Sequence, residues 1–258
     1  QHTGKTTYLE DAEHIYYNAL CHTQRCNGGF GCDNCPGKAI GTPFLKVHAD
    51  EAHWCCTMRG GEGLSRVAEY SSFKKGRTVF LTSFHDAQYQ LQLGSKQFAL
   101  TEHTGYPFDG KLEFKVSRNT AGIVDLCIFM PSWTSDWSLT VNGKVQKISR
   151  VNGFASIRRA FRIGDVVKMN FKEVLGYSKS VDANLADYYQ LRPYYGPLFL
   201  GVESKDAVKL TASDLGQLEQ RGPAEFVVKG KDIHLTPIYH LMDTKVWSGT
   251  GYQKQIIF

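Results

Sequence analysis

The sequence predicts a mainly β protein in which antiparallel β-sandwich domains follow a helical hairpin. Apolar residues recur at helical spacing before residue 76 and alternate with polar residues after it. Turn pairs such as Asp109-Gly110 and Asn142-Gly143 separate the alternating runs, as hairpins require. We therefore expect a helical segment over residues 1–75, a β-sandwich domain over residues 76–185, and a second β-rich domain, or the remainder of the sandwich, over residues 186–258.

The helical segment contains two helical patterns separated by a cysteine-rich loop. The first pattern covers Tyr8 to Leu20, and the second runs from Leu64 to Tyr70. Two helices of this size cannot bury both of their faces without a partner layer. We therefore interpret them as the end of an all-helical domain whose earlier helices precede Gln1. A first residue that is not Met agrees with this interpretation.

The β-rich part contains apolar residues at every second position of several short runs. These runs include Val79 to Leu81, Tyr89 to Leu93, Leu112 to Val116, Leu126 to Met130, and Leu139 to Val141. Trp133 and Trp137 follow the fourth run and could stack on a sugar, although a Trp in a sandwich more often fills the core. Asp109, Glu113 and Asp165 stand in turn or strand contexts where we expect them to be solvated.

Composition and charge narrow the class of function. The chain has 258 residues, of which 42% are hydrophobic, enough for one large or two ordinary domains with a core. The formal net charge of +5 is spread without a block of Lys and Arg, which is too mild to indicate nucleic-acid binding. No apolar run is long enough to span a bilayer, so we expect no membrane segment.

Six of the seven cysteines crowd into the first quarter of the chain. They are Cys21, Cys26, Cys32, Cys35, Cys55 and Cys56. Clustering in a long chain indicates metal or redox chemistry more than a disulfide scaffold. Cys32 and Cys35 have the two-residue spacing of a zinc knuckle, which is incomplete without further ligands such as Cys26, Cys55 or Cys56. A disulfide in this loop is the alternative.

The adjacent cysteines Cys55 and Cys56 are the most informative of the set. Neighbouring side chains of an extended segment point to opposite faces, so vicinal thiols rarely pair with each other but can bind a metal at a bend. A thiolate held by a metal is also a nucleophile. The alternative is that one of them is a small buried apolar residue. His22, His48 and His53 lie nearby in sequence and are either ligands or ordinary surface or core histidines.

Several short motifs follow one another along the chain in a fixed order. The helical part carries the run from Asp11 to Leu20, the Cys55-Cys56 pair, and then a helix with Arg66 and Tyr70. The β part carries Thr104-Gly105-Tyr106-Pro107, Pro131-Ser132-Trp133, Val141-Asn142-Gly143, the stretch from Gly153 to Asp165, and Gly196-Pro197-Leu198. In this order they resemble the bacterial β-L-arabinofuranosidase group, glycoside hydrolase family 127 and its relatives, across most of the chain.

The resemblance implies an (α/α)-barrel glycosidase with β-sandwich domains behind the barrel. Such enzymes retain the anomeric configuration and use a zinc-held cysteine thiolate as nucleophile and a glutamic acid as proton donor, in contrast to the usual pair of carboxylates. Carried over by position, Cys55 would be the nucleophile and a zinc ligand, and Cys56 a second zinc ligand. Glu13 falls where the family places a glutamate near the sugar, with an exposed helical Glu as the alternative.

The chain also departs from the family's pattern. The family supplies its general acid and a Glu-x-Cys zinc motif from helices before this segment, and no Glu-x-Cys occurs in this sequence. After the cysteines the family usually has a proline, where this chain has Thr57-Met58-Arg59-Gly60-Gly61. The loop from Cys26 to Cys35 replaces an aromatic region that helps to wall the family's sugar pocket. We therefore expect a relative that acts on a different sugar, or an inactive one.

Two functions of different classes follow. The first is the C-terminal portion of a retaining glycosidase that acts on plant-type oligosaccharides, such as a β-L-arabinofuranoside or a related sugar. Its partners would be the oligosaccharide and an upstream helical barrel of the same polypeptide, and the segment alone would be inactive. The second is a noncatalytic β-sandwich module that binds carbohydrate or stabilises a barrel, with the cysteine cluster holding a structural zinc.

Overall fold

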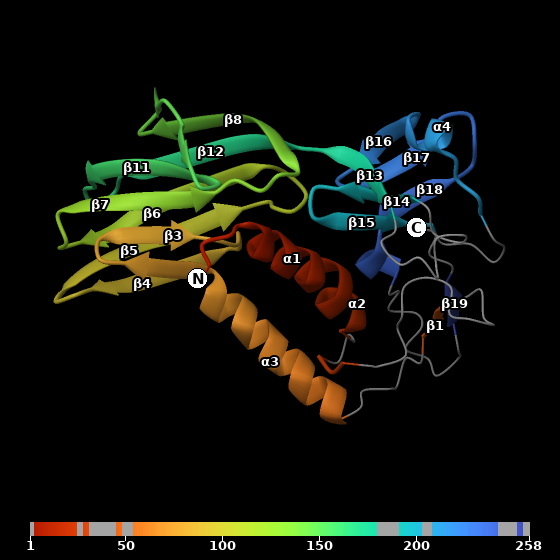
Figure 1. Ribbon diagram of the computed structural model, residues 1–258, viewed down its shortest axis with the longest axis horizontal. Helices are drawn as coiled ribbons and strands as arrows, with labels where there is room; N and C mark the ends of the chain where they lie inside the picture. The colour runs from red at the N-terminus through yellow and green to blue at the C-terminus, as the bar shows by residue number, and fades with distance from the viewer. Residues whose placement is uncertain are drawn as a thin grey trace. The chain divides into compact units, whose positions relative to one another are not determined.

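The structure is a computed structural model that describes residues 3–24, 28–30, 45–47, 54–179, 191–202, 208–241 and 252–254. It confirms the expected fold class, because the chain is mainly antiparallel β with a helical hairpin at its N-terminus (Figure 1). The chain divides into two compact units. Unit 1 is residues 1–13 with 66–174, and unit 2 is residues 14–65 with 175–258. The expected boundaries after residues 75 and 185 stay predictions.

The N-terminal helices confirm the helical patterns of the sequence. The first stretch is α1 (Thr7–Ile15), a π-helical turn η1 (Tyr16–Leu20), and α2 (Cys21–Thr23). The second helix is α3 (Trp54–Tyr70), which is continuous although it contains Gly60, Gly61 and Gly63. It begins before the cysteine pair, earlier than the pattern from Leu64 indicated. No helix in the described ranges is both long and apolar enough to cross a membrane.

Unit 1 contains a six-stranded sheet in the order β4-β5-β6-β12-β8-β9. Its strands are β4 (Ala87–Leu93), β5 (Lys96–Thr104), β6 (Lys111–Asn119), β12 (Val166–Glu173), β8 (Thr134–Val141) and β9 (Lys144–Val145). All of its neighbouring strands pair antiparallel. This sheet explains most of the alternation in the sequence, since one face is buried and the other is solvated.

The second sheet of unit 1 has the order β10-β11-β7-β3-β2. Its strands are β10 (Ser149–Val151), β11 (Phe154–Ala160), β7 (Ile123–Phe129), β3 (Thr78–Leu81) and β2 (Ser72–Lys75). Here β3 and β7 run parallel, which departs from the expected antiparallel pairing. The reason is connectivity: β4, β5 and β6 intervene between them, and such a long crossover permits parallel strands.

The core of unit 1 is built from the inward positions of both sheets. Side chains less than 2% exposed come from the six-stranded sheet at Phe98, Phe114 and Met169, and from the other sheet at Leu81 and Phe129. Burying each such side chain contributes about 1.5–3 kcal/mol to the hydrophobic stabilisation of the fold. The core therefore lies between two sheets, as a sandwich requires.

Unit 2 contains a third sheet in the order β13-β14-β15-β18-β17-β16. Its strands are β13 (Leu175–Lys179), β14 (Leu191–Tyr195), β15 (Leu198–Gly201), β18 (His234–Pro237), β17 (Glu225–Val228) and β16 (Leu218–Gly222). The short helix α4 (Ala212–Leu215) begins at a capping box of Thr211 and Asp214, and a 3₁₀ turn, η2 (Ile238–Leu241), follows β18. A separate pair joins β1 (Leu45–Val47) to β19 (Tyr252–Lys254).

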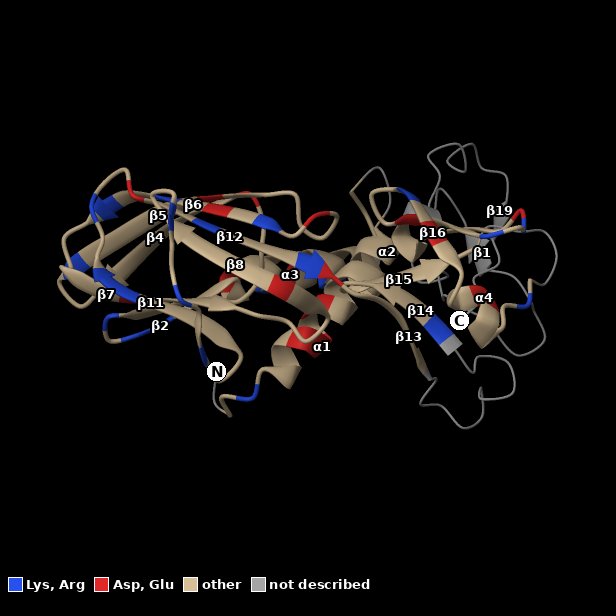
Figure 2. Cartoon of the chain, turned by 90° about the horizontal axis from the view of Figure 1, so that it is seen from above, with Lys and Arg blue, Asp and Glu red and all other residues tan. Residues whose placement is uncertain are grey.

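Unit 2 has a hydrophobic cluster of its own. Among the described residues this cluster contains Leu200, Val202, Leu215, Phe226, Val228 and Leu235. Lys and Arg residues and Asp and Glu residues are dispersed over the described elements of each unit (Figure 2). This agrees with the sequence, which has no concentrated basic block and a modest net charge.

Gly110 offers a direct test of the packing in unit 1. A Cβ at this position would lie 2.1 Å from the backbone oxygen of Phe171, and the Phe171 N–H donates to the Gly110 carbonyl at 2.9 Å. We expect Gly110→Ala to lower the free energy of unfolding by about 1–3 kcal/mol, because the clash is with backbone. Urea denaturation measures the change.

The matched control is Gly61→Ala in α3, where an added Cβ meets nothing within 4 Å. Alanine is the better helix former by up to about 1 kcal/mol, so this variant should be as stable as the parent or more stable. Equal midpoints for Gly110→Ala and the parent would show that the close approach at Phe171 is not tight in solution.

Candidate functional site

Glu13 is buried inside unit 1, so the alternative of an exposed helical glutamate is wrong. It lies on α1 and is 3% exposed. The Tyr106 hydroxyl donates a hydrogen bond to Glu13 Oε2 at 2.5 Å, and the Trp133 indole N–H donates to the Tyr106 hydroxyl at 3.3 Å. Trp133 is itself 6% exposed, which confirms the core reading of this residue over the sugar-stacking one.

A second contact of α1 lies one helical turn before Glu13. The Ser132 backbone N–H donates to Glu10 Oε1 at 2.7 Å, next to Trp133 in sequence. The Tyr106 ring is in turn fixed by edge-on contacts with Phe84 and Phe171, at centroid distances of 5.4 and 6.0 Å. Helix α1 is therefore attached to the sandwich of unit 1 through side chains that the core holds in place.

The environment of Glu13 favours its neutral form. The pKa of Glu13 is raised to about 8, mainly by desolvation on burial; the Tyr106 hydrogen bond opposes this rise and the charge of Glu10 adds to it. The second oxygen, Oε1, is buried and has no hydrogen-bond partner among the described residues. Near neutral pH this carboxyl is therefore mostly protonated.

A second buried carboxyl, that of Glu102 on β5, was missed by the sequence reasoning. It is 0% exposed, and the Tyr89 hydroxyl donates to its Oε2 at 2.9 Å. Burial raises the pKa of Glu102 to about 8, with smaller upward contributions from Asp86 and Glu13. A signal existed, since Glu102 continues the inward phase of Phe98 and Leu100. Such groups occur at functional sites and in structural networks alike.

Asn18 organises the π-helical turn in unit 2. Its side-chain amide donates to the carbonyls of His14 and Pro197 at 2.9 and 2.8 Å, and its Oδ1 accepts from the Phe199 N–H at 2.6 Å. The His14 ring stacks on Phe199 with centroids 5.0 Å apart. The turn η1 is thus joined to β15 by the Asn18 side chain.

The cysteine pair lies in the first turn of α3 rather than at a bend of an extended segment. Cys55 is exposed and Cys56 is half-buried, and their sulfur atoms are 3.8 Å apart. This is too far for a disulfide, which needs about 2.05 Å. Two thiolates at about 2.3 Å from one tetrahedral zinc are separated by about 3.8 Å. The pair therefore fits two corners of a zinc site.

The remaining ligand candidates are not brought to this pair in the described part of the chain. Within it, no three or more His, Cys, Asp and Glu side chains form a group that could hold a metal. His22 is fully buried on α2, with its Nδ1 3.1 Å from the Ile238 carbonyl oxygen. The other proposed ligands, Cys26, Cys32, Cys35, His48 and His53, lie outside the described residues.

The residues after the cysteine pair have a packing role. Phe30 is 3% exposed, and its N–H donates to the Thr57 hydroxyl at 3.0 Å. Its ring lies so close to Gly60 that a Cβ there would be 2.2 Å from it. Thr57 and Gly60 belong to the stretch that departs from the family's pattern. In this chain the departure accommodates a residue of the cysteine-rich loop.

Residues 78–173 match the family model described as β-L-arabinofuranosidase, GH127 middle domain. Over these residues the chain is similar to GH127 proteins. The matched residues run from β3 to β12 and so cover the sandwich of unit 1 that holds Tyr106, Trp133 and Glu102. No curated protein sequence matches the chain.

Solved structures show the same fold over nearly all of this GH127-like chain. A glycoside hydrolase matches with a TM-score of 0.74 and 18% identity, covering 99% of this chain and 49% of its own. A GH127 β-L-arabinofuranosidase from Geobacillus stearothermophilus T6 has a TM-score of 0.69, and a GH127 β-arabinofuranosidase has 0.71. Both are 18% identical, and each match covers 98% of this chain and 46% of the other. The chain spans about half the length of these structures.

The motifs that carry the GH127 likeness meet in space within each unit. In unit 1, Trp133 donates to the Tyr106 hydroxyl, which donates to Glu13, and Asn142 donates to Asp165 at 2.8 Å. In unit 2, Pro197 accepts the hydrogen bond of Asn18. Asp165 is 6% exposed, so its expected solvation is wrong: it accepts from the Arg162 N–H as well. These motif residues have structural contacts that explain their presence.

The buried carboxyls predict how the stability of unit 1 depends on pH. Unfolded Glu ionises near 4.5, whereas burial raises the pKa of Glu13 and Glu102 to about 8 in the folded state. The folded state therefore binds more protons between these values, and stability falls as pH rises from about 5 to 8, then levels off. Each carboxyl contributes a slope of about 1.4 kcal/mol per pH unit inside this window. Urea midpoints at pH 5–9 measure it.

Glu13→Gln should remove one carboxyl's share of this slope, because it cannot ionise. The control is Glu69→Gln on α3, an exposed residue paired with Arg66, which should keep the slope of the parent. If the stability of Glu13→Gln depends on pH as steeply as that of the parent, the Glu13 carboxyl is not held protonated in the folded state. The side chain would then not be buried in unit 1.

Proposed function

We propose that this chain is the C-terminal portion of a retaining glycosidase that acts on plant-type oligosaccharides, such as a β-L-arabinofuranoside or a related sugar. The observation that carries the proposal is the match of residues 78–173 to the GH127 middle domain. The solved relatives named as GH127 β-arabinofuranosidases support it through their fold. The oligosaccharide and an upstream helical barrel of the same polypeptide are its partners.

Cys55 and Cys56 are the proposed zinc ligands. Their sulfur separation of 3.8 Å fits two thiolates on one tetrahedral zinc, and both lie on the same helical turn. Zinc, when bound, keeps the thiols deprotonated at neutral pH. Further ligands come from the upstream polypeptide or from Cys26, Cys32 and Cys35. Cys26 and Cys32 flank Phe30 in sequence, and Phe30 contacts α3 beside the cysteine pair.

Cys55 is the proposed nucleophile because it is the exposed member of the pair, whereas Cys56 is half-buried. Its thiolate attacks the anomeric carbon, a carbon–sulfur bond forms, and the glycosidic carbon–oxygen bond breaks. The leaving oxygen takes its proton from a general acid of the upstream polypeptide. Water then displaces the sulfur, so that two inversions retain the configuration.

Glu13 is proposed as a substrate contact only because of its position in the family's sequence pattern. In this chain its carboxyl is buried against Tyr106, and its unpartnered Oε1 is the atom with hydrogen-bonding capacity to spare. Removal of a substrate contact weakens binding and transition-state stabilisation less than removal of a nucleophile does. The two roles therefore separate in kinetics.

The alternative function is a noncatalytic module, in which the sandwich binds carbohydrate or supports a barrel and the cysteine cluster holds a structural zinc. A Glu-x-Cys motif in the polypeptide upstream of Gln1 would favour the glycosidase instead, because the family's complete zinc site uses one. The noncatalytic module differs from the glycosidase proposal in requiring no nucleophile. Replacing Cys55 in an active parent polypeptide distinguishes them.

The chain alone should be inactive on an aryl β-L-arabinofuranoside, because the proposed general acid belongs to the upstream polypeptide. A longer natural polypeptide that contains it should hydrolyse this substrate and lose at least about 10³-fold in kcat on Cys55→Ser. Glu13→Gln should cause a smaller loss. Zinc content, measured on the same preparations, should fall in the Cys55→Ser, Cys56→Ser double variant.

The control is Cys127→Ser, which replaces a buried cysteine of β7 that has no proposed part in the chemistry. It should keep the kcat and zinc content of the parent. Unchanged turnover after Cys55→Ser would overturn the nucleophile assignment and favour the noncatalytic module. Tight zinc that survives the double cysteine variant would remove the link between this pair and metal.

A further inference from the structure

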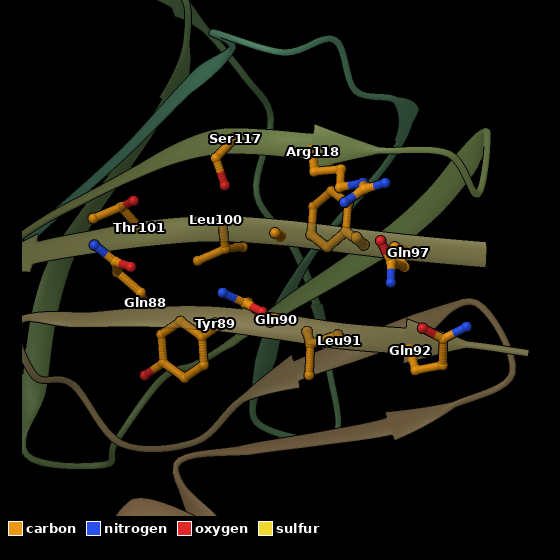
Figure 3. A pocket seen from close by; sticks show the side chains of 12 residues that line it. Gln88, Tyr89, Gln90, Leu91, Gln92, Gln97, Leu100, Thr101, Ser117 and Arg118 are labelled. Carbon is orange, nitrogen blue, oxygen red and sulfur yellow. The ribbon is translucent and has the colours of Figure 1, made fainter. Parts of the chain in front are cut away.

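The outer face of the six-stranded sheet in unit 1 carries a recess of about 540 Å³ (Figure 3). We call it the glutamine recess; its polar lining includes Gln88, Gln90, Gln92, Thr101, Ser117 and Arg118. Gln88, Gln90 and Gln92 take successive outward positions of β4, and all three are exposed. One strand thus presents a row of amides to solvent.

Cross-strand pairing completes the recess. Gln88 lies opposite Thr101, and Gln92 lies opposite Gln97, so that both edges of the recess carry polar side chains from two strands. Gln90 lies opposite Ala99, whose small side chain leaves the middle of the recess low. Directly opposed side chains in a sheet are close enough to contact one ligand together.

A β-bulge adds the third strand. The register between β5 and β6 shifts between Ala99 and Leu100, which pairs Ala99 with Arg118 but Leu100 with Val116. Ser117 and Arg118 are consequently both exposed, although regular alternation would turn one of them inward. Bulges often re-aim a side chain beside a binding site. Here the bulge keeps Arg118 in the lining of the recess.

The recess differs in charge from the rest of the same sheet face. Elsewhere on that face Lys168 pairs with Glu113 and Lys172 with Asp136, each at 2.8 Å. Among the lining residues Arg118 is the one charged side chain, and it has no ion pair in the described part of the chain. The lining contains no carboxylate, which disfavours a cation.

The geometry points to a subsite for an oligosaccharide that carries a uronic acid. Each glutamine amide both donates and accepts hydrogen bonds, as paired sugar hydroxyls require, and the guanidinium of Arg118 matches a planar carboxylate. The sugar lies along β4, with its hydroxyls on Gln88, Gln90 and Thr101 and its carboxylate on Arg118. The site lies wholly in unit 1 and does not depend on the cysteine pair or on the proposed catalysis.

Two matched ligands test this on the whole chain. Isothermal titration compares α-1,4-linked trigalacturonate with α-1,4-linked galactotriose, which differ only in oxidation at C6. We expect the acidic trisaccharide to bind at least about tenfold more tightly, because only its carboxylate can form a charged hydrogen bond with Arg118. Added salt should reduce this preference.

Arg118→Gln should abolish the preference for the acidic trisaccharide, and Gln90→Leu should weaken binding of both sugars. The control is Arg150→Gln, an exposed residue of β10 in the other sheet, which should behave as the parent. Melting temperatures of all variants should be unchanged, because each side chain is exposed. Equal affinity for both sugars, no binding of either, or an unaltered preference in Arg118→Gln overturns the proposal. If the longer polypeptide has no glycosidase activity, the proposed function fails, but the binding of the acidic trisaccharide to this recess is still expected.

Discussion

The hydrogen bond between the Tyr106 hydroxyl and the buried carboxyl of Glu13 is the contact on which the attachment of α1 to the sandwich depends. Tyr106 cannot turn away, because Phe84 and Phe171 hold its ring and Trp133 donates to its oxygen. Glu13 has little access to water, because it is 3% exposed. Leaving either group without the other would cost about 1–3 kcal/mol. The carboxyl therefore stays in the interior in its neutral, protonated form.

Unit 2 holds its helices by the same principle, with polar side chains that bind backbone of another segment. Asn18 joins η1 to the strand that follows Pro197, and Thr57 binds the backbone of Phe30. The tight approach of Phe30 to Gly60 then fixes the start of α3, where the cysteine pair lies. Any chemistry of Cys55 depends on this packing, because a helix whose first turn frayed would not keep two sulfur atoms 3.8 Å apart.

The sequence predicted the sheets well because alternation is a local signal. Strands β4 and β5 follow it residue by residue, and the turns at Gly110 and Gly143 fall where expected. The burial of Glu13 could not be predicted from periodicity, since a helix pattern does not show which neighbour covers its polar positions. The glycines after the cysteine pair concealed the start of α3, because glycine is a poor helix former. Gly60 leaves room for the ring of Phe30, and a contact with so distant a residue leaves no local signal in the sequence. The bulge that exposes Arg118 depends on strand pairing and likewise left no local signal.

A double-mutant cycle of Glu13→Gln and Tyr106→Phe measures how strongly this hydrogen bond couples α1 to the sandwich. The free energy of unfolding is measured at pH 7 for the parent, both single variants and the double variant. A direct buried hydrogen bond predicts a coupling energy of about 1–3 kcal/mol, with the double variant less destabilised than the sum of the singles. A coupling within about 0.3–0.5 kcal/mol of zero, the error of additivity, would contradict the attachment of α1 through this contact.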